Sequence, residues 1–137
     1  MSCKSAIYTS NNSGITITTT EGTFVQVPFG SIVRRFGNNI QLDGGSILCC
    51  ESGYFDTKIS ITVTPAAAST ITAQLYQNGN AIPGALATTT VAATDTTITL
   101  PIIALVRNCG CDCNSVLTLG INASCIINNF ATVVEKL

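Results

Sequence analysis

The chain has 137 residues, of which 46% are hydrophobic and 9% charged, and this length fits a single domain with one core. The six lysines and arginines are dispersed along the sequence, which excludes the basic footprint that a nucleic-acid-binding protein needs. A net charge of −1 and so few charged residues give little repulsion between copies, so the composition favours self-association.

The first 20 residues are predicted to form an N-terminal arm, and residues 21–137 the folded domain. A flexible link is expected at residues 10–14, because their sequence Ser-Asn-Asn-Ser-Gly is typical of a loop. Two outcomes are open for the arm: it is disordered, as short polar termini often are, or it docks into a neighbouring subunit. The side chains expected to dock are Ile7, Tyr8, Ile15 and Ile17.

The domain is predicted to contain about eight short strands. Thr, Val and Ile dominate the sequence, and no window shows the 3.6-residue apolar period of an amphipathic helix. Turn residues recur about every 8 to 12 residues, as they do in β-sandwiches. In chain order, the apolar or alternating segments are 23–27, 31–36, 40–42, 47–50, 55–64, 71–75, a short stretch around Val91, 98–106, 117–121 and 130–137.

Residues 53–84 are the stretch around which the rest is organised. From Phe55 to Thr64 every second residue suits a buried face and the residues between are polar, which is typical of a half-buried strand. Asn78-Gly79 favours the positive φ angles of a two-residue type I′ hairpin. Pro101 lacks a backbone N–H, so its strand must lie at a sheet edge or contain a bulge. We therefore predict an all-β fold, an antiparallel jelly-roll sandwich.

Catalysis is the function that the sequence argues against most clearly. The chain has no histidine, and its seven carboxylates are dispersed without an obvious pair. General acid–base chemistry needs a positioned group with a tuned pKa, and a cysteine nucleophile needs a base beside it. We therefore expect a protein that is not an enzyme and that uses no cofactor.

The Arg34-Arg35 pair concentrates positive charge in a chain that has little of it. Two roles are open for it. One is binding an anionic ligand. The other, which we favour, is a solvated edge or an ion pair between subunits.

Three motifs together resemble a known family. They are Gly53-Tyr54-Phe55 at the start of a strand, the segment from Leu75 to Gly84 with its Leu-x-x-Asn-Gly hairpin, and the closing segment from Asn129 to Val134. Their order and spacing are similar to the globular C-terminal domain of the collagen-like glycoprotein on the exosporium of Bacillus spores. That domain is a small relative of the complement and tumour-necrosis-factor jelly rolls. The resemblance covers residues 20–137 and implies tight trimers around a three-fold axis.

The chain departs from the collagen-tailed members because it has no Gly-X-Y repeats. It looks closer to fibre-forming endospore appendage subunits, in which similar jelly rolls stack through N-terminal arms. The resemblance thus implies a structural subunit that forms a homotrimer and then a filament, with an anchoring protein on the spore surface as a further partner. The alternative is a trimeric head of a spore-surface or phage fibre that binds a receptor or a carbohydrate.

An endospore surface is the expected location. We see no signal peptide and no stretch of about 20 apolar residues that could span a membrane. Spore-surface proteins are made in the mother-cell cytosol and released at lysis, which would account for a missing export signal.

Seven cysteines are present, an odd number that leaves at least one free or bonded to another chain. The Cys109-x-Cys111-x-Cys113 spacing differs from the usual zinc knuckle, although a zinc site completed by Cys49 and Cys50 stays open. Reduced thiols are a second alternative, and Cys125 fits a small buried hydrophobe. We favour disulfides, with Cys3 bonded to a cysteine of the next subunit layer. The candidates for bonds between subunits are Cys3, Cys49, Cys50, Cys109, Cys111 and Cys113.

Overall fold

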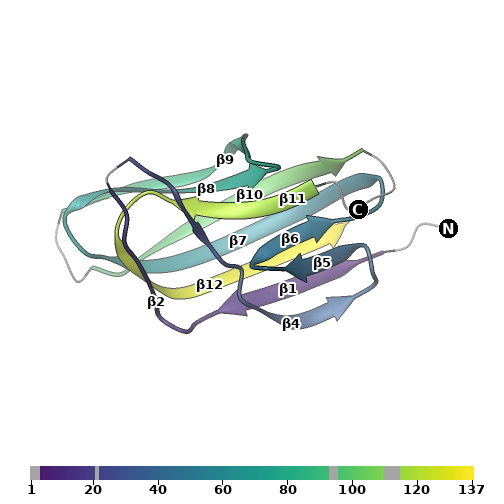
Figure 1. Ribbon diagram of the computed structural model, residues 1–137, viewed down its shortest axis with the longest axis horizontal. Coiled ribbons are helices and arrows are strands. Elements are labelled where there is room, and N and C mark those ends of the chain that lie inside the picture. Colours follow the sequence, from purple (N-terminus) through teal and green to yellow (C-terminus); the bar gives the residue numbers. More distant parts are fainter. Residues whose placement is uncertain (1–3, 21, 93–95, 110–114) are drawn as a thin grey trace.

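The computed structural model describes residues 4–20, 22–92, 96–109 and 115–137. Every regular element in this part of the chain is a β-strand (Figure 1). The strands are β1 (Ala6–Asn11), β2 (Ile15–Ile17), β3 (Val25–Val27), β4 (Ser31–Phe36), β5 (Ile40–Asp43), β6 (Ser46–Cys49), β7 (Gly53–Pro65), β8 (Ser69–Gln77), β9 (Asn80–Val91), β10 (Ile98–Asn108), β11 (Ser115–Ile121) and β12 (Cys125–Lys136).

The strands form two antiparallel sheets around one core. The first, here the β12 sheet, has the order β10-β7-β12-β1-β4, and β2 also pairs with β12. The second, here the β11 sheet, has the order β5-β6-β11-β8-β9, and β3 also pairs with β11. The predicted all-β antiparallel sandwich is confirmed. The described strands number twelve rather than about eight, because short pieces such as β2, β3, β5 and β6 flank the long strands.

The core is built by alternation along the long strands. On β7, Phe55, Thr57, Ile59 and Ile61 are buried while the alternate residues face outward, as the period of two predicts. At the centre, the rings of Phe29 and Phe130 pack with their centroids 5.1 Å apart. Burial of this apolar surface is the main force that holds the two sheets together.

Two local predictions are confirmed. Asn78 and Gly79 have φ angles of 54° and 82°, and they join β8 to β9 in a hairpin whose flanking residues, Gln77 and Asn80, are paired. Pro101 lies in β10, the edge strand of the β12 sheet, where its missing N–H breaks no pairing on the open side.

The division into an arm of residues 1–20 and a domain of residues 21–137 needs correction. Strand β1 is an interior strand of the β12 sheet, paired along its whole length with β12 on one side and from Ala6 to Ser10 with β4 on the other. Ile7 and Ile17 are buried in the chain's own core, Ile15 is half-buried against it, and Tyr8 is exposed. The alternating pattern of this segment thus reflects a place within its own sandwich.

Candidate functional site

An apolar patch lies on the outward face of the β12 sheet. Its most exposed members are Ile103 and Leu105 on the edge strand β10, whose side chains are 75% and 58% exposed. The patch extends across the sheet to strands β12 and β1. Val133 of β12 and Tyr8 of β1 are register partners, so they lie side by side. We define the apolar face as Tyr8, Tyr54, Ile103, Leu105 and Val133.

Three charged side chains lie in the middle of this face. Lys58 places its Nζ atom 3.2 Å from Asp56 and 3.6 Å from Glu135. The hydrogen bond with Asp56 and then the negative charges of Asp56 and Glu135 raise the pKa of Lys58. The group is exposed, so its ion pairs add little to stability by themselves. One lysine against two carboxylates leaves a net charge of −1 at the centre of the face.

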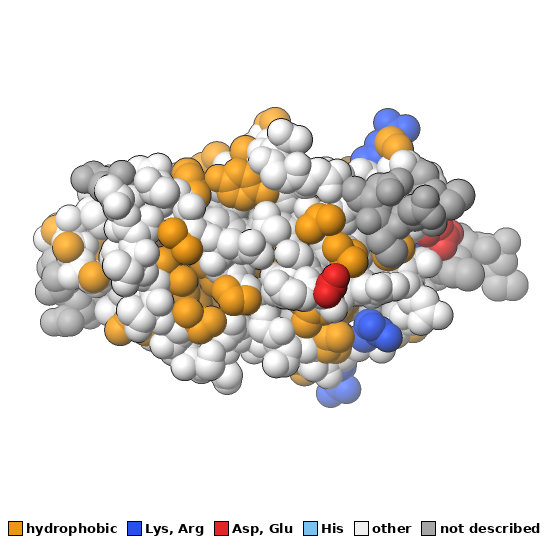
Figure 2. All heavy atoms as spheres, viewed as in Figure 1, with side chains coloured by type: hydrophobic (Ala, Val, Ile, Leu, Met, Phe, Trp, Pro, Cys, Tyr) orange, Lys and Arg blue, Asp and Glu red, His pale blue; other side chains and the backbone are white. Residues whose placement is uncertain are grey.

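Charge is unevenly distributed over the molecule. From Ile59 to Val106 the sequence has a single charged residue, Asp95. On the face shown in Figure 2, the described charged side chains gather in the half that carries both chain ends in Figure 1. On this face, the described side chains of the other half are uncharged polar and apolar groups. Between two copies, these side chains give no long-range repulsion.

Strand β4 forms the other edge of the β12 sheet, and all six of its residues are exposed. It carries Arg34 and Arg35, and neither takes part in an ion pair among the described residues. A hollow of about 480 Å³ lies where β4 meets β1, lined by Tyr8, both arginines and Phe36 among others. The two roles predicted for the arginine pair therefore both remain predictions.

The cysteines that the structure describes differ in state. Cys49 and Cys125 are buried free thiols, and burial raises their pKa to about 12 and about 11. Cys109 is an exposed free thiol, whereas Cys50 is disulfide-bonded. The expectation that Cys125 is a small buried hydrophobe is confirmed. Cys3, Cys111 and Cys113, which were predicted as disulfide or zinc candidates, lie outside the described residues.

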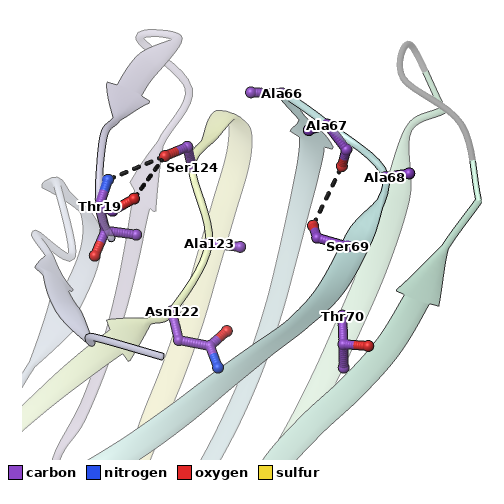
Figure 3. A pocket seen from close by; sticks show the side chains of 9 residues that line it. All are labelled: Thr19, Ala66, Ala67, Ala68, Ser69, Thr70, Asn122, Ala123 and Ser124. Atoms are coloured by element: carbon purple, nitrogen blue, oxygen red, sulfur yellow. Dashed lines mark hydrogen bonds between the residues drawn. The ribbon is translucent and has the colours of Figure 1, made fainter. Parts of the chain in front are cut away.

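A small hollow of about 230 Å³ opens at the end of the sandwich away from the chain termini (Figure 3). Thr19 and Ser124 close one wall through two hydrogen bonds of 3.0 Å, one from the Thr19 N–H to Ser124 Oγ and one from Ser124 Oγ–H to the Thr19 carbonyl. The remaining lining comes from residues 66–70, 122 and 123, and none of the nine lining residues is charged or aromatic. The hollow therefore offers neither an acid–base group nor a ring on which a sugar could stack.

The structure brings together one carboxylate pair that the sequence did not reveal. Asp56 and Glu135 are register partners on β7 and β12. They lie on the outward sheet face with Lys58 between them, and Asp56 also lines an open hollow of about 390 Å³ together with Ile103 and Leu105. Among the described residues, no group of three metal-ligating side chains occurs. The same part of the chain contains no helix able to cross a membrane.

The two facing sheets form a jelly roll, and solved structures of tumour-necrosis-factor and complement proteins have the same fold. The chain aligns with the crystal structure of murine APRIL at a TM-score of 0.73 and 10% identity, covering 98% of this chain and 100% of that one.

Two further solved structures agree. Eiger, the tumour necrosis factor of S. frugiperda, matches with a TM-score of 0.69 and 11% identity over 97% of this chain and 91% of Eiger. The globular domain of the zebrafish complement 1qA protein matches with a TM-score of 0.68 and 10% identity over 98% and 96%. At the sequence level, no family model and no curated protein matches. These likenesses show the fold.

Proposed function

We propose that the chain is a non-enzymatic structural subunit that forms a trimer through its apolar face and assembles further into a filament on the endospore surface. The trimer is implied by the family resemblance of the sequence motifs, and the shared jelly-roll fold supports it. Filament and location follow from the resemblance to appendage subunits. Among the described residues, no group of three side chains is arranged to hold a metal ion.

The observation that carries the proposal is the exposure of Ile103 and Leu105 on a regular sheet face. Neighbouring exposed aliphatic side chains on a regular sheet face often mark an interaction surface, because exposed apolar area is unfavourable in water. Beside them lies an open hollow of about 390 Å³, and Lys58 pairs with both carboxylates of the face. Such a surface fits a second copy of the same chain better than it fits a small ligand.

The position of the N-terminal residues constrains the proposed disulfides. Ser5 Oγ accepts a hydrogen bond of 3.2 Å from the N–H of Asn39, and the Asn39 carbonyl accepts one of 2.7 Å from the N–H of Cys50. Ser5 therefore lies at the end of the sandwich that bears Cys49, Cys50 and Cys109. Two residues of extended chain span at most about 7 Å, which is the reach from Ser5 to Cys3.

In the proposed trimer, which is a ring of three chains, this placement favours disulfides between neighbouring chains of one ring or between the like ends of two rings. A contact between like ends closes on itself, whereas a filament grows through contacts between unlike ends. We therefore propose that filament growth rests on non-covalent contacts between unlike ends, and that disulfides at the cysteine-bearing end reinforce the ring. Among the described candidates, Cys109 is the best placed, because its thiol is free and exposed.

Negative-stain electron microscopy of the purified full-length protein, with and without reductant, tests the proposal. Regular filaments in both conditions would support non-covalent growth, and loss of filaments in reductant would return the disulfides to the role of linking layers. Discrete trimer-sized particles in both conditions would contradict the filament and favour the binding head. Monomers at micromolar concentration would contradict the trimer itself.

A further inference from the structure

The cysteine-bearing end also holds a lysine, an asparagine and a glutamate that converge on one glycine. Lys136 is the last residue of β12 and Asn108 the last of β10, and β7 lies between these strands in the sheet. Asn108 is the register partner of Gly53. Lys136 is paired with Phe55, two residues further along β7 on the same inward face. The lysine and the asparagine thus face the core from either side of the start of β7.

The Lys136 side chain turns toward Gly53. A Cβ atom on Gly53 would lie 3.3 Å from Cε and 3.6 Å from Nζ of Lys136, so the lysine occupies the space that a side chain would fill. Gly53 also has a φ of 147°, which disfavours other residues. Although lysine is usually exposed, the Lys136 side chain is only 7% exposed, with Nζ 4.0 Å from Oε1 of Glu51.

The Asn108 side chain is held rigidly and its carbonyl is polarised. The residue is 1% exposed. Its Nδ2 donates a hydrogen bond of 2.8 Å to the backbone carbonyl of Glu51, and its Oδ1 accepts one of 2.9 Å from the Ser115 hydroxyl. Gln77 donates in turn to Ser115 Oγ over 2.9 Å, which fixes the hydroxyl in its donating role. A hydroxyl aimed at a carbonyl oxygen stabilises the charge that develops there when a nucleophile attacks.

We propose that Lys136 and Asn108 form an intramolecular amide cross-link, with Glu51 as the proton acceptor and Ser115 as the hydrogen-bond donor to the oxyanion. A lysine amine is a nucleophile once it has lost a proton, and Glu51 is the carboxylate beside it. The groups needed for acyl transfer therefore lie at one end of the fold, where Lys136 and Asn108 are buried and the Glu51 side chain is 44% exposed.

The reaction balances without any other reagent. Glu51 takes one proton from the Lys136 ammonium, and Nζ attacks Cγ of Asn108. The Nζ–Cγ bond forms and the Cγ–Nδ2 bond breaks. The two protons that Nζ loses, one of them by way of Glu51, leave with Nδ2 as ammonium. The product is a neutral amide between the ends of β12 and β10.

Such a bond would tie together two strands that are separated by β7 and distant in sequence. Like a disulfide, it would restrict the unfolded chain, and unlike a disulfide it would resist reductant. The cross-link would stabilise the same end of the sandwich that bears Cys50 and Cys109. This inference does not depend on the trimer or the filament, because the three side chains belong to one chain.

Mass spectrometry of the full-length protein tests the cross-link directly. The folded protein is incubated, then reduced and denatured, and its intact mass is measured. We expect the mass to be lower than that of the sequence by one molecule of ammonia. We also expect a branched peptide that joins the Asn108 and Lys136 segments after proteolysis, and no tryptic cleavage after Lys136.

Two variants provide matched controls. Lys136→Arg keeps the positive charge beside Glu51 but removes the amine, and should show the full mass of its sequence. Glu51→Gln removes the proton acceptor and should reduce the fraction of cross-linked chain. A wild-type mass equal to that of the sequence would overturn the proposal. So would the same deficit in Lys136→Arg, because ammonia would then be lost elsewhere, for example by cyclisation of another asparagine.

Discussion

The two ends of the sandwich are stabilised by different kinds of interaction. At the end away from the termini, here the threonine end, exposed threonines form hydroxyl pairs across neighbouring strands at 2.9–3.1 Å. The pairs are Thr62–Thr99, Thr64–Thr97, Thr70–Thr90 and Thr72–Thr88. At the other, here the charged end, ion pairs surround Lys58, and a buried network runs from Gln77 through Ser115 to Asn108.

The comparison shows how one fold separates inert surface from reactive groups. The hydroxyl pairs of the threonine end carry no titratable group, so pH and salt leave them unchanged. Lys136, Glu51 and the free thiols of Cys49 and Cys109 gather at the charged end, whereas the buried thiol of Cys125 lies at the threonine end, paired with Pro65. We therefore expect substitutions at the charged end to change assembly, stability or chemistry, and equivalent ones at the threonine end to change little.

The largest effect is expected from Ile103→Lys on the apolar face. A charge buried in an interface without a partner is strongly unfavourable, so the variant should be monomeric where the wild type self-associates. Sedimentation velocity measures the change. Thr90→Lys, which adds the same charge to an exposed threonine-end position, is the control and should keep the wild-type state. Equal behaviour of the two variants would show that the apolar face is not the interface.

Ser115→Ala should lower the free energy of unfolding by about 1–3 kcal/mol, because it leaves the buried Asn108 and the half-buried Gln77 with one partner fewer. Urea denaturation under reducing conditions measures the loss. The matched change at the threonine end, Thr70→Val, removes one exposed hydroxyl pair and should stay within about 0.5 kcal/mol of the wild type. A larger loss for Thr70→Val than for Ser115→Ala would refute the difference between the ends.

Alkaline pH should destabilise the reduced protein through its two buried thiols. Cys49 and Cys125 keep their protons when folded, since burial raises their pKa to about 12 and about 11 from the ordinary value of 9.0. Above pH 9 the unfolded chain ionises first and binds fewer protons, so stability falls as the pH rises from there toward 11. Urea midpoints at pH 8 and at about pH 10.5 measure an expected loss of about 2 kcal/mol for each thiol. Cys109→Ser should show the same fall, because that thiol is exposed.

Thr132→Val should slightly stabilise the protein. The hydroxyls of Thr9, Thr57 and Thr132 are buried on the inward face of the β12 sheet without a hydrogen-bond partner among the described residues. Replacing a buried unpaired hydroxyl by a methyl group of similar size should raise the free energy of unfolding by about 1 kcal/mol. Thermal denaturation provides the measurement. A destabilised Thr132→Val variant would mean that this hydroxyl is hydrogen-bonded after all.

The sequence by itself determined the class of fold and its central hairpin. The alternation from Phe55 to Thr64 reports burial directly, because side chains of a strand point alternately to its two faces. Asn78-Gly79 and Pro101 likewise act through their own backbone geometry and the hydrogen bond that proline lacks. Each of these signals depends on a few consecutive residues, so it can be interpreted without knowing which strands pair with one another.

Only the tertiary structure decided which strands and which side chains are neighbours. Strand β1 looked like an arm because a short alternating segment does not say whose sheet it joins, and its place between β12 and β4 depends on pairings with residues far along the chain. Asp56 with Glu135, and Lys136 with Asn108, are brought together by register across β7, β10 and β12. Register depends on the packing of the whole sandwich, so no single stretch of sequence could reveal these neighbours.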